Sequence, residues 1–218
     1  MNIATRCVGF MALLLFFFSQ PVHCQERPAA LGLYGGFGLP VTSGNLNDFF
    51  KYELGGTMSL NYYKNKMAYF ISISGTAGKL KHDILSDDGN IWEKGKEASF
   101  FSYGLNVGYN IYPNIRFRIT PFAGLILSEC RPSTKEMKEY PYLKQFDVNP
   151  QFSPAIGLNI TYRFITKNTF NEYGTGFCFG INARALYIPW AVRGDKVPYK
   201  GDLCYFSLGI VMEILNTY

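Results

Sequence analysis

The sequence predicts an all-β fold, an eight-stranded antiparallel up-and-down transmembrane β-barrel. Strict alternation of apolar and polar residues recurs about eight times, which is the pattern of strands whose two faces meet different surroundings. Short and long connections alternate, as they do in a barrel whose strands follow one another around the wall. The chain of 218 residues is also unusually aromatic (17%) and unusually poor in charged residues (17%) for a soluble domain.

The N-terminus has the profile of a secretory signal peptide, with Arg6 at a short basic start and an apolar run behind it. That run is too short for a helix that crosses a bilayer, which needs about twenty residues. We expect a cleaved signal peptide at residues 1–24 and the outer-membrane barrel at residues 25–218. Lipidation of Cys24 is the alternative, but His23 stands where a lipoprotein signal has a small residue.

Alternation is clearest in residues 101–111, where the odd positions are large and apolar and the even positions are small or polar. Pro121 and Pro154 fall inside expected strands and predict bulges, because proline cannot donate to the ladder. The eight expected strands cover residues 31–39, 52–62, 67–73, 101–111, 115–127, 152–164, 177–187 and 206–214.

The apolar face of these strands is expected to point at lipid. Gly, Ser, Thr and Asn dominate the polar face, whereas the lysines gather in the connections. A soluble barrel of the lipocalin kind would show the same alternation in the opposite sense, with Lys and Glu on its water-facing side. Small polar residues suit a narrow lumen, and aromatic residues near the strand ends suit the interfacial girdles of a membrane barrel.

Charged residues on the polar face are expected to form an ionic network inside the lumen. Four of them should meet at the periplasmic end. Arg116 and Arg118 begin the fifth strand, Arg163 ends the sixth, and Glu213 lies near the end of the eighth. Burying them singly would cost several kcal/mol each, so pairing is expected, and the bridges would obstruct the lumen. The predicted network comprises Arg116, Arg118, Arg163, Arg184, Glu53 and Glu213.

The last strand carries the expected assembly signal, an alternating apolar series that ends in a terminal aromatic residue: Phe206, Leu208, Ile210, Met212, Ile214 and Tyr218. With residues 109–128 (YNIYPNIRFRITPFAGLILS) and 31–40 (LGLYGGFGLP), the chain resembles the small outer-membrane β-barrel superfamily that includes the OmpA transmembrane domain, and in particular the compact envelope barrels of Bacteroidota. The resemblance implies the outer membrane of a Gram-negative bacterium and assembly by the barrel-assembly machinery.

Three cysteines follow the signal peptide, without the CxxC spacing of a zinc site. Cys130 and Cys204 fall beside long outer connections, and a disulfide between them is a candidate because the export compartment permits disulfides. Cys178 falls near the opposite end. No metal site and no cofactor are expected.

We expect a non-enzymatic integral barrel whose long outer loops support the envelope or contact partners. Its expected partners are outer-membrane lipids, lipopolysaccharide and other envelope proteins. Removal of the signal peptide takes away Arg6 and lowers the formal charge from +5 to +4, which is too small to indicate nucleic acid. One alternative is a subunit of a secretion or assembly machine. Another is a lipid A-modifying enzyme, for which His82 and Asp83 would have to act from a long loop, where sequence neighbours rarely form a preorganised triad.

Overall fold

The computed structural model describes residues 29–86, 88–111, 116–164, 175–193 and 200–216. The predicted signal peptide, Tyr218, the short connection around Pro113 and most of the connection at 166–175 lie outside the described residues.

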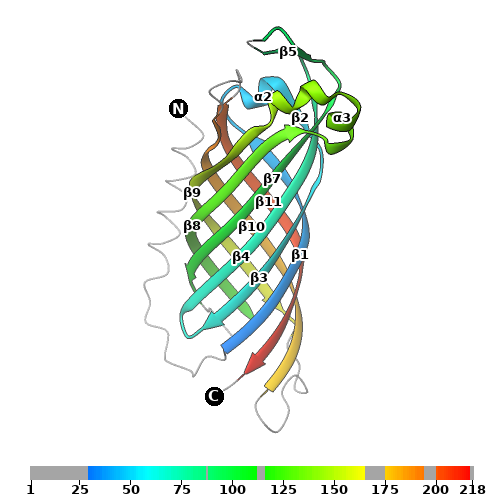
Figure 1. Cartoon of the computed structure of the whole chain (residues 1–218). Coiled ribbons are helices and arrows are strands. Elements are labelled where there is room, and N and C mark those ends of the chain that lie inside the picture. The colour runs from blue at the N-terminus through cyan, green and yellow to red at the C-terminus, as the bar shows by residue number, and fades with distance from the viewer. Residues whose placement is uncertain (1–28, 87, 112–115, 165–174, 194–199, 217–218) are drawn as a thin grey trace.

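Eight long strands form a closed antiparallel barrel (Figure 1). Each pairs with its neighbours in the chain, and β1 pairs with β11 to close the wall. The predicted fold class is therefore confirmed. The strands are β1 (Ala29–Thr42), β3 (Gly55–Lys64), β4 (Met67–Leu80), β7 (Glu97–Tyr109), β8 (Phe117–Pro132), β9 (Val148–Arg163), β10 (Thr175–Arg193) and β11 (Lys200–Asn216).

The outer surface of the wall is apolar. Alternate residues along each strand are exposed, large and hydrophobic, among them Phe37 at 70% and Phe152 at 78% relative exposure. Polar residues such as Asn61 and Thr161 occupy the opposite face and are buried in the lumen. A water-soluble barrel would have this order reversed, so the direction predicted for the apolar face is correct and the wall is that of a transmembrane barrel.

The turn between β3 and β4 shows how the periplasmic end is built. Only Asn65 and Lys66 separate Lys64 from Met67, and Asn65 has φ 55°. Asparagine tolerates this left-handed conformation better than most residues, and two-residue hairpins require it. Both β1 and β11 also reach this end of the barrel (Figure 1).

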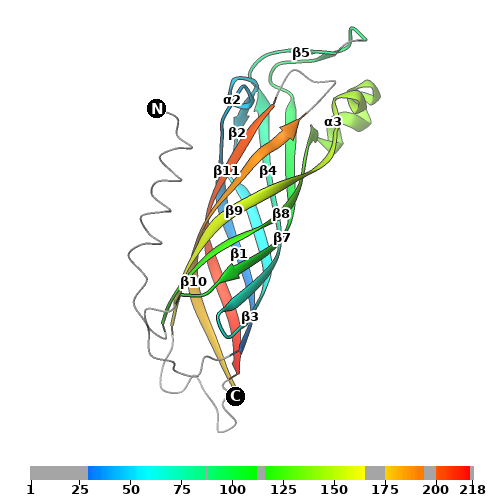
Figure 2. The same ribbon diagram turned by 90° about the vertical axis from the view of Figure 1, so that its left-hand side faces the viewer.

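The outer end differs from the expectation of long irregular loops, because the strands extend past the predicted boundaries to Leu80, Pro132 and Arg193. The connections between them contain short elements (Figure 2). None of the helices in the described part of the chain is long and apolar enough to cross a membrane. The elements are α2 (Leu46–Phe49), β2 (Phe50–Tyr52), β5 (Ile84–Leu85), β6 (Ile91–Trp92), α3 (Thr134–Glu139) and the 3₁₀ helix η1 (Pro141–Phe146).

The two strand prolines do not cause bulges, which corrects the prediction. Pro121 pairs with Leu158 and Pro154 pairs with Leu125, both in unbroken register. The register shifts occur nearer the outer ends, between Ser128 and Cys130 and between Ile188 and Val192. Each proline lacks the backbone N–H that would donate to the neighbouring strand, but the residue pairs on either side keep the strands aligned.

Candidate functional site

A buried ionic cluster lies inside the periplasmic end of the lumen. Glu213 of β11 accepts hydrogen bonds from the guanidinium groups of Arg118 on β8 and Arg163 on β9, the second at 2.7 Å between Nε and Oε2. All three side chains are almost fully buried. One carboxylate thus bridges two cations from strands that are not its neighbours, and it ties opposite parts of the wall together.

The aromatic ring of Tyr63 supports this cluster. The guanidinium carbon of Arg118 lies 3.5 Å from the centre of the Tyr63 ring, a cation–π contact. Arg118 also donates to the hydroxyl of Thr161 at 3.5 Å. The face of a tyrosine and a neutral hydroxyl therefore complete the surroundings of a cation that would be costly to bury alone.

Arg184 lies in the same lumen but apart from the carboxylate. Its Nε donates to Asn159 at 2.7 Å and its Nη2 to Ser59 at 2.9 Å. Its guanidinium group lies 5.1 Å from the ring centre of Tyr34. Within the described residues, Arg184 contacts no carboxylate, so neutral acceptors and aromatic faces surround this cation, and its predicted ion pair is not seen.

Two other residues of the predicted network lie elsewhere. Arg116 is exposed just before β8 begins, with its backbone carbonyl accepting from the backbone N–H of Arg163 at 2.8 Å. Glu53 is exposed at the outer end, in the break between β2 and β3. The prediction treated residues 52–62 as one strand, but β2 pairs with the outer end of β4 and the chain bends before β3. Both residues are therefore on the surface rather than in the lumen.

Aromatic side chains fill the lumen from the ionic cluster toward the middle of the barrel. Tyr63, Phe70 and Phe122 form a chain of edge contacts, with ring centres 5.9 and 5.4 Å apart. Inside the lumen, the hydroxyl of Tyr34 on β1 donates to Ser207 on the neighbouring strand β11 at 3.0 Å. These residues share the inward face with the small polar ones, so the lumen is packed rather than open.

The connections at the outer end fold into a cap with its own hydrophobic core. We define the outer cap as the described residues of the three connections that join β1 to β3, β4 to β7 and β8 to β9, which are 43–54, 81–86, 88–96 and 133–147. Trp92 is at its centre and is fully buried. The centre of its ring lies 5.9 Å from the ring centre of Phe50 and 5.8 Å from that of Phe146. The core also includes Leu46, Leu80, Ile84, Phe100, Cys130 and Leu143.

Polar contacts hold the three cap segments against one another. The backbone N–H of Lys81 donates to the carbonyl of Phe49 at 2.8 Å, and that of Glu97, the first residue of β7, donates to the Glu136 side chain at 2.9 Å. The ammonium group of Lys96 lies 4.1 Å from the ring centre of Tyr140. The cap is therefore a folded layer over the barrel mouth.

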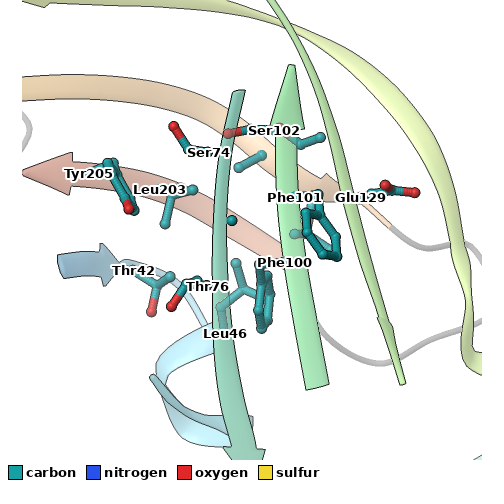
Figure 3. A pocket seen from close by; sticks show the side chains of 14 residues that line it. Thr42, Leu46, Ser74, Thr76, Phe100, Phe101, Ser102, Glu129, Leu203 and Tyr205 are labelled. Atoms are coloured by element: carbon teal, nitrogen blue, oxygen red, sulfur yellow. The ribbon is translucent and has the colours of Figure 1, made fainter. Parts of the chain in front are cut away.

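A small cavity lies directly beneath the cap, among side chains from β1, α2, β4, β7 and β11 (Figure 3). Its volume is about 20 Å³, enough for a single water molecule. Leu46 and Phe100 lie on its cap side, and Ser74 and Tyr205 are among the residues that line it farther down the lumen. This space is too small for a substrate.

The cysteines do not form the proposed disulfide. Cys130 points inward and is buried in the core of the cap, whereas Cys204 is on the outward face of β11, between Val41 and Tyr187. The two sulfurs thus lie on opposite faces of the wall, on strands that are not neighbours, and each is a thiol. Cys178 lies inside the lumen, paired in register with Glu213.

The alternating residues of the last strand, which form the predicted assembly signal, are all exposed on the outward face of β11 as far as Ile214. Tyr218, its final member, is outside the described residues. Recognition of this strand during assembly stays a prediction.

His82 and Asp83 are exposed in the cap. The Asp83 side chain accepts from the backbone N–H of Lys94 at 2.6 Å, and the Ser86 hydroxyl accepts from the backbone N–H of Asn90 at 3.2 Å. Both side chains therefore stabilise the connection between β4 and β7. Among the described residues, no group of three His, Cys, Asp or Glu side chains is arranged to hold a metal ion.

Sequence reasoning missed the cap and the aromatic filling. The cap could have been found from the apolar residues within the supposedly polar connections, such as Leu46, Phe50, Trp92, Leu143 and Phe146. The aromatic filling could have been found from parity, because Phe70 and Phe122 alternate in phase with Ser72 and Thr120 and therefore point inward.

No protein-family model and no curated protein matches this chain. Three similar solved structures are Neisserial surface protein A (12% identity, 87% of this chain and 97% of that one, TM-score 0.49), Ail of Yersinia pestis (14%, 87% and 99%, 0.44) and the outer membrane protein OprG of Pseudomonas aeruginosa (11%, 86% and 97%, 0.43).

The wall of this chain identifies its surroundings. A closed barrel leaves no strand edge unpaired, which is the condition for β-structure in lipid, and its exposed face is apolar around the whole circumference. Single-chain antiparallel barrels with an even number of strands and such a surface are the form that bacterial outer-membrane proteins take. The chain is an integral outer-membrane β-barrel protein of a Gram-negative cell envelope.

Proposed function

We propose that this protein is a non-enzymatic barrel that acts through its outer cap, by contacting other molecules of the envelope or its exterior. The observation that carries the proposal is the hydrophobic core of the cap, with Trp92 fully buried between Phe50 and Phe146. A folded cap presents a fixed surface, and fixed surfaces bind at a lower entropic cost than mobile loops.

The packed lumen supports the same proposal. The ionic cluster of Arg118, Arg163 and Glu213 lies at one end, aromatic rings fill the middle, and the cap covers the other end. General solute flow needs a continuous aqueous path, which narrow barrels do not provide.

The exposed part of the cap includes an apolar pair. Leu85 and Ile91 face each other across the β5–β6 ribbon and are 64% and 45% exposed, while Ile84 and Trp92 face the core. The ribbon extends beyond the end of the barrel wall (Figure 2). We further propose that the chain belongs with the compact Bacteroidota-type barrels that its sequence resembles.

The test combines two measurements on the full-length protein. Reconstitution in planar lipid bilayers should give no stable open-channel current, and a steady current would favour a pore. In cells, partners cross-linked through the cap should be lost in a Leu85→Asp/Ile91→Asp variant and kept in a Lys135→Asp variant, which changes an exposed position on α3. Equal cross-linking in both variants would contradict binding through the ribbon.

A further inference from the structure

The lipid-facing wall of the barrel is hollowed on one side. A groove of about 780 Å³ lies over β1, β3, β4 and β7, from the middle of the wall toward its outer end. Leu33, Met58, Ile71 and Ile73 are among its apolar lining residues, and all four are exposed. Its volume lies within the range of sites that hold ligands of small-molecule size.

Glycines on the outward face form the floor of this groove. A β-carbon added to Gly35 or Gly56 would meet no atom within 4 Å, so the space outside these residues is open. A β-carbon added to Gly75, directly opposite Gly56, would lie 3.0 Å from the ring of Phe101, which therefore forms one wall. Elsewhere the outward positions mostly carry bulky side chains, so the groove is a local feature of this wall.

Two lysines stand at the upper end of the groove. Lys51 on β2 lies directly opposite Lys79 on β4, both exposed, and Lys79 is two residues beyond Ala77, which lines the groove. Like charges that face each other across a strand pair are destabilising unless an anion lies between them. Glu97 faces Lys79 from the other side and Glu53 follows Lys51, but neither forms an ion pair with these lysines within 4 Å.

We propose that the groove binds one hydrocarbon chain of a phosphate-bearing lipid of the outer leaflet, with the phosphate at Lys51 and Lys79. The apolar channel within the membrane-facing surface and the adjacent cationic pair match the two parts of such an amphiphile. Because the surrounding lipid is as apolar as the groove, close packing and the phosphate contact supply the preference. The chain site rests on the membrane-spanning wall, and although Lys51 belongs to the outer cap, the proposal does not depend on the partner contacts proposed for the cap.

The test uses the full-length protein in lipid nanodiscs that contain phosphatidylglycerol with a photoreactive group on one acyl chain. Peptide mapping after irradiation should find labels concentrated on residues 54–60 and 71–77. In a Gly35→Leu/Gly56→Leu variant, labelling there should fall to the level seen on β8 and β10. An Ala123→Leu/Ala183→Leu variant, which fills outward positions on that opposite side, should leave the groove labelling unchanged.

The headgroup is tested in the same system. Replacing photoreactive phosphatidylglycerol with a diacylglycerol that carries the same chains should reduce groove labelling several-fold, and a Lys51→Gln/Lys79→Gln variant should remove this preference for phosphate. Heat-modifiable electrophoretic mobility that matches the wild type identifies the variants that still fold. Gly56→Ala fills less of the groove and serves where the double leucine variant does not fold. Uniform labelling around the barrel would overturn the proposed chain site, and equal labelling by both lipids would overturn the phosphate contact.

Discussion

The two ends of the lumen are closed by opposite kinds of chemistry. At the periplasmic end, Glu213 holds Arg118 and Arg163 by charge, and each residue comes from a strand of the wall. At the outer end, Trp92 and its neighbours close the mouth by apolar packing, and they come mainly from the connections. A buried charge cluster depends on every member being present, whereas a small apolar core can lose area gradually, so the two closures should respond differently to substitution.

The largest effect is expected for Glu213→Ala, because it leaves Arg118 and Arg163 buried without their carboxylate. Removing one partner of a buried ionic group costs about 3–5 kcal/mol of unfolding free energy. Urea unfolding of the protein in liposomes measures this loss. A Glu213→Ala/Arg163→Met variant should recover part of the stability, and the exposed Glu53→Ala substitution should be neutral. Strict additivity of the two lumen substitutions would contradict the coupling.

Next is the centre of the cap. Trp92→Ala should cost about 3 kcal/mol of local stability, at the low end for a buried aromatic residue because loops relax more readily than a barrel wall. The readout is alkylation of Cys130, which is buried in the same core and should become reactive when the cap opens. Trp92→Phe should change little, since the indole N–H has no hydrogen-bond acceptor among the described residues. Slow alkylation of Cys130 in Trp92→Ala would show that the cap does not depend on this ring.

Arg184 should behave differently from the other two lumen arginines. It is buried without a carboxylate, so Arg184→Met should lie within about 1 kcal/mol of the wild type or be stabilising, as replacements of buried charges by apolar residues often are. Arg118→Met removes a partner of Glu213 and should be clearly destabilising. The same urea titration compares them, and equal losses for both variants would mean that Arg184 has a charged partner.

The smallest effect concerns pH. Tyr52 lies in the cap, above the membrane-spanning part of the wall, and burial raises the pKa of its hydroxyl above the ordinary value. A raised pKa in the folded state favours the neutral form, so this contribution is complete below pH of about 10 and is lost as pH rises above it. Proteolysis of the cap should therefore accelerate as the pH rises above about 10, the ordinary pKa of tyrosine, and less so in Tyr52→Phe. Identical profiles would exclude Tyr52 as a cause.

The wall could be predicted from sequence because its alternation is long and its two faces differ in kind, as in residues 101–111, of which 101–109 belong to β7. The pairing of Glu213 with Arg118 and Arg163 also follows from parity and strand position. Glu53 could not be placed in this way, because a short break before β3 changes its location without interrupting the apparent alternation. Tertiary pairing of β2 with β4, which local sequence does not encode, decides its position.

The cap was harder to predict for a related reason. Its core brings Phe50, Trp92 and Phe146 together from three connections, each with too few apolar residues to show a periodic pattern. The candidate disulfide placed Cys130 and Cys204 at the same end of the barrel, which is correct, but it left out the faces of the strands, and a disulfide needs both side chains on one side of the wall. Parity alone distinguishes them, because Cys130 shares the inward face with Ser128 and Cys204 shares the outward face with Phe206.

Native-state hydrogen exchange in nanodiscs tests most directly whether the two closures are separate units. Amides of residues 46–52, 84–86, 88–92 and 141–146 should exchange together through an opening that costs less than unfolding of the strands, because the cap consists of short elements without the long hydrogen-bond ladders of the wall. Trp92→Ala should lower this opening energy and leave the protection of β8 and β11 unchanged, whereas Glu213→Ala should do the reverse. Simultaneous exchange of cap and strands, with both variants acting on both regions equally, would contradict the account.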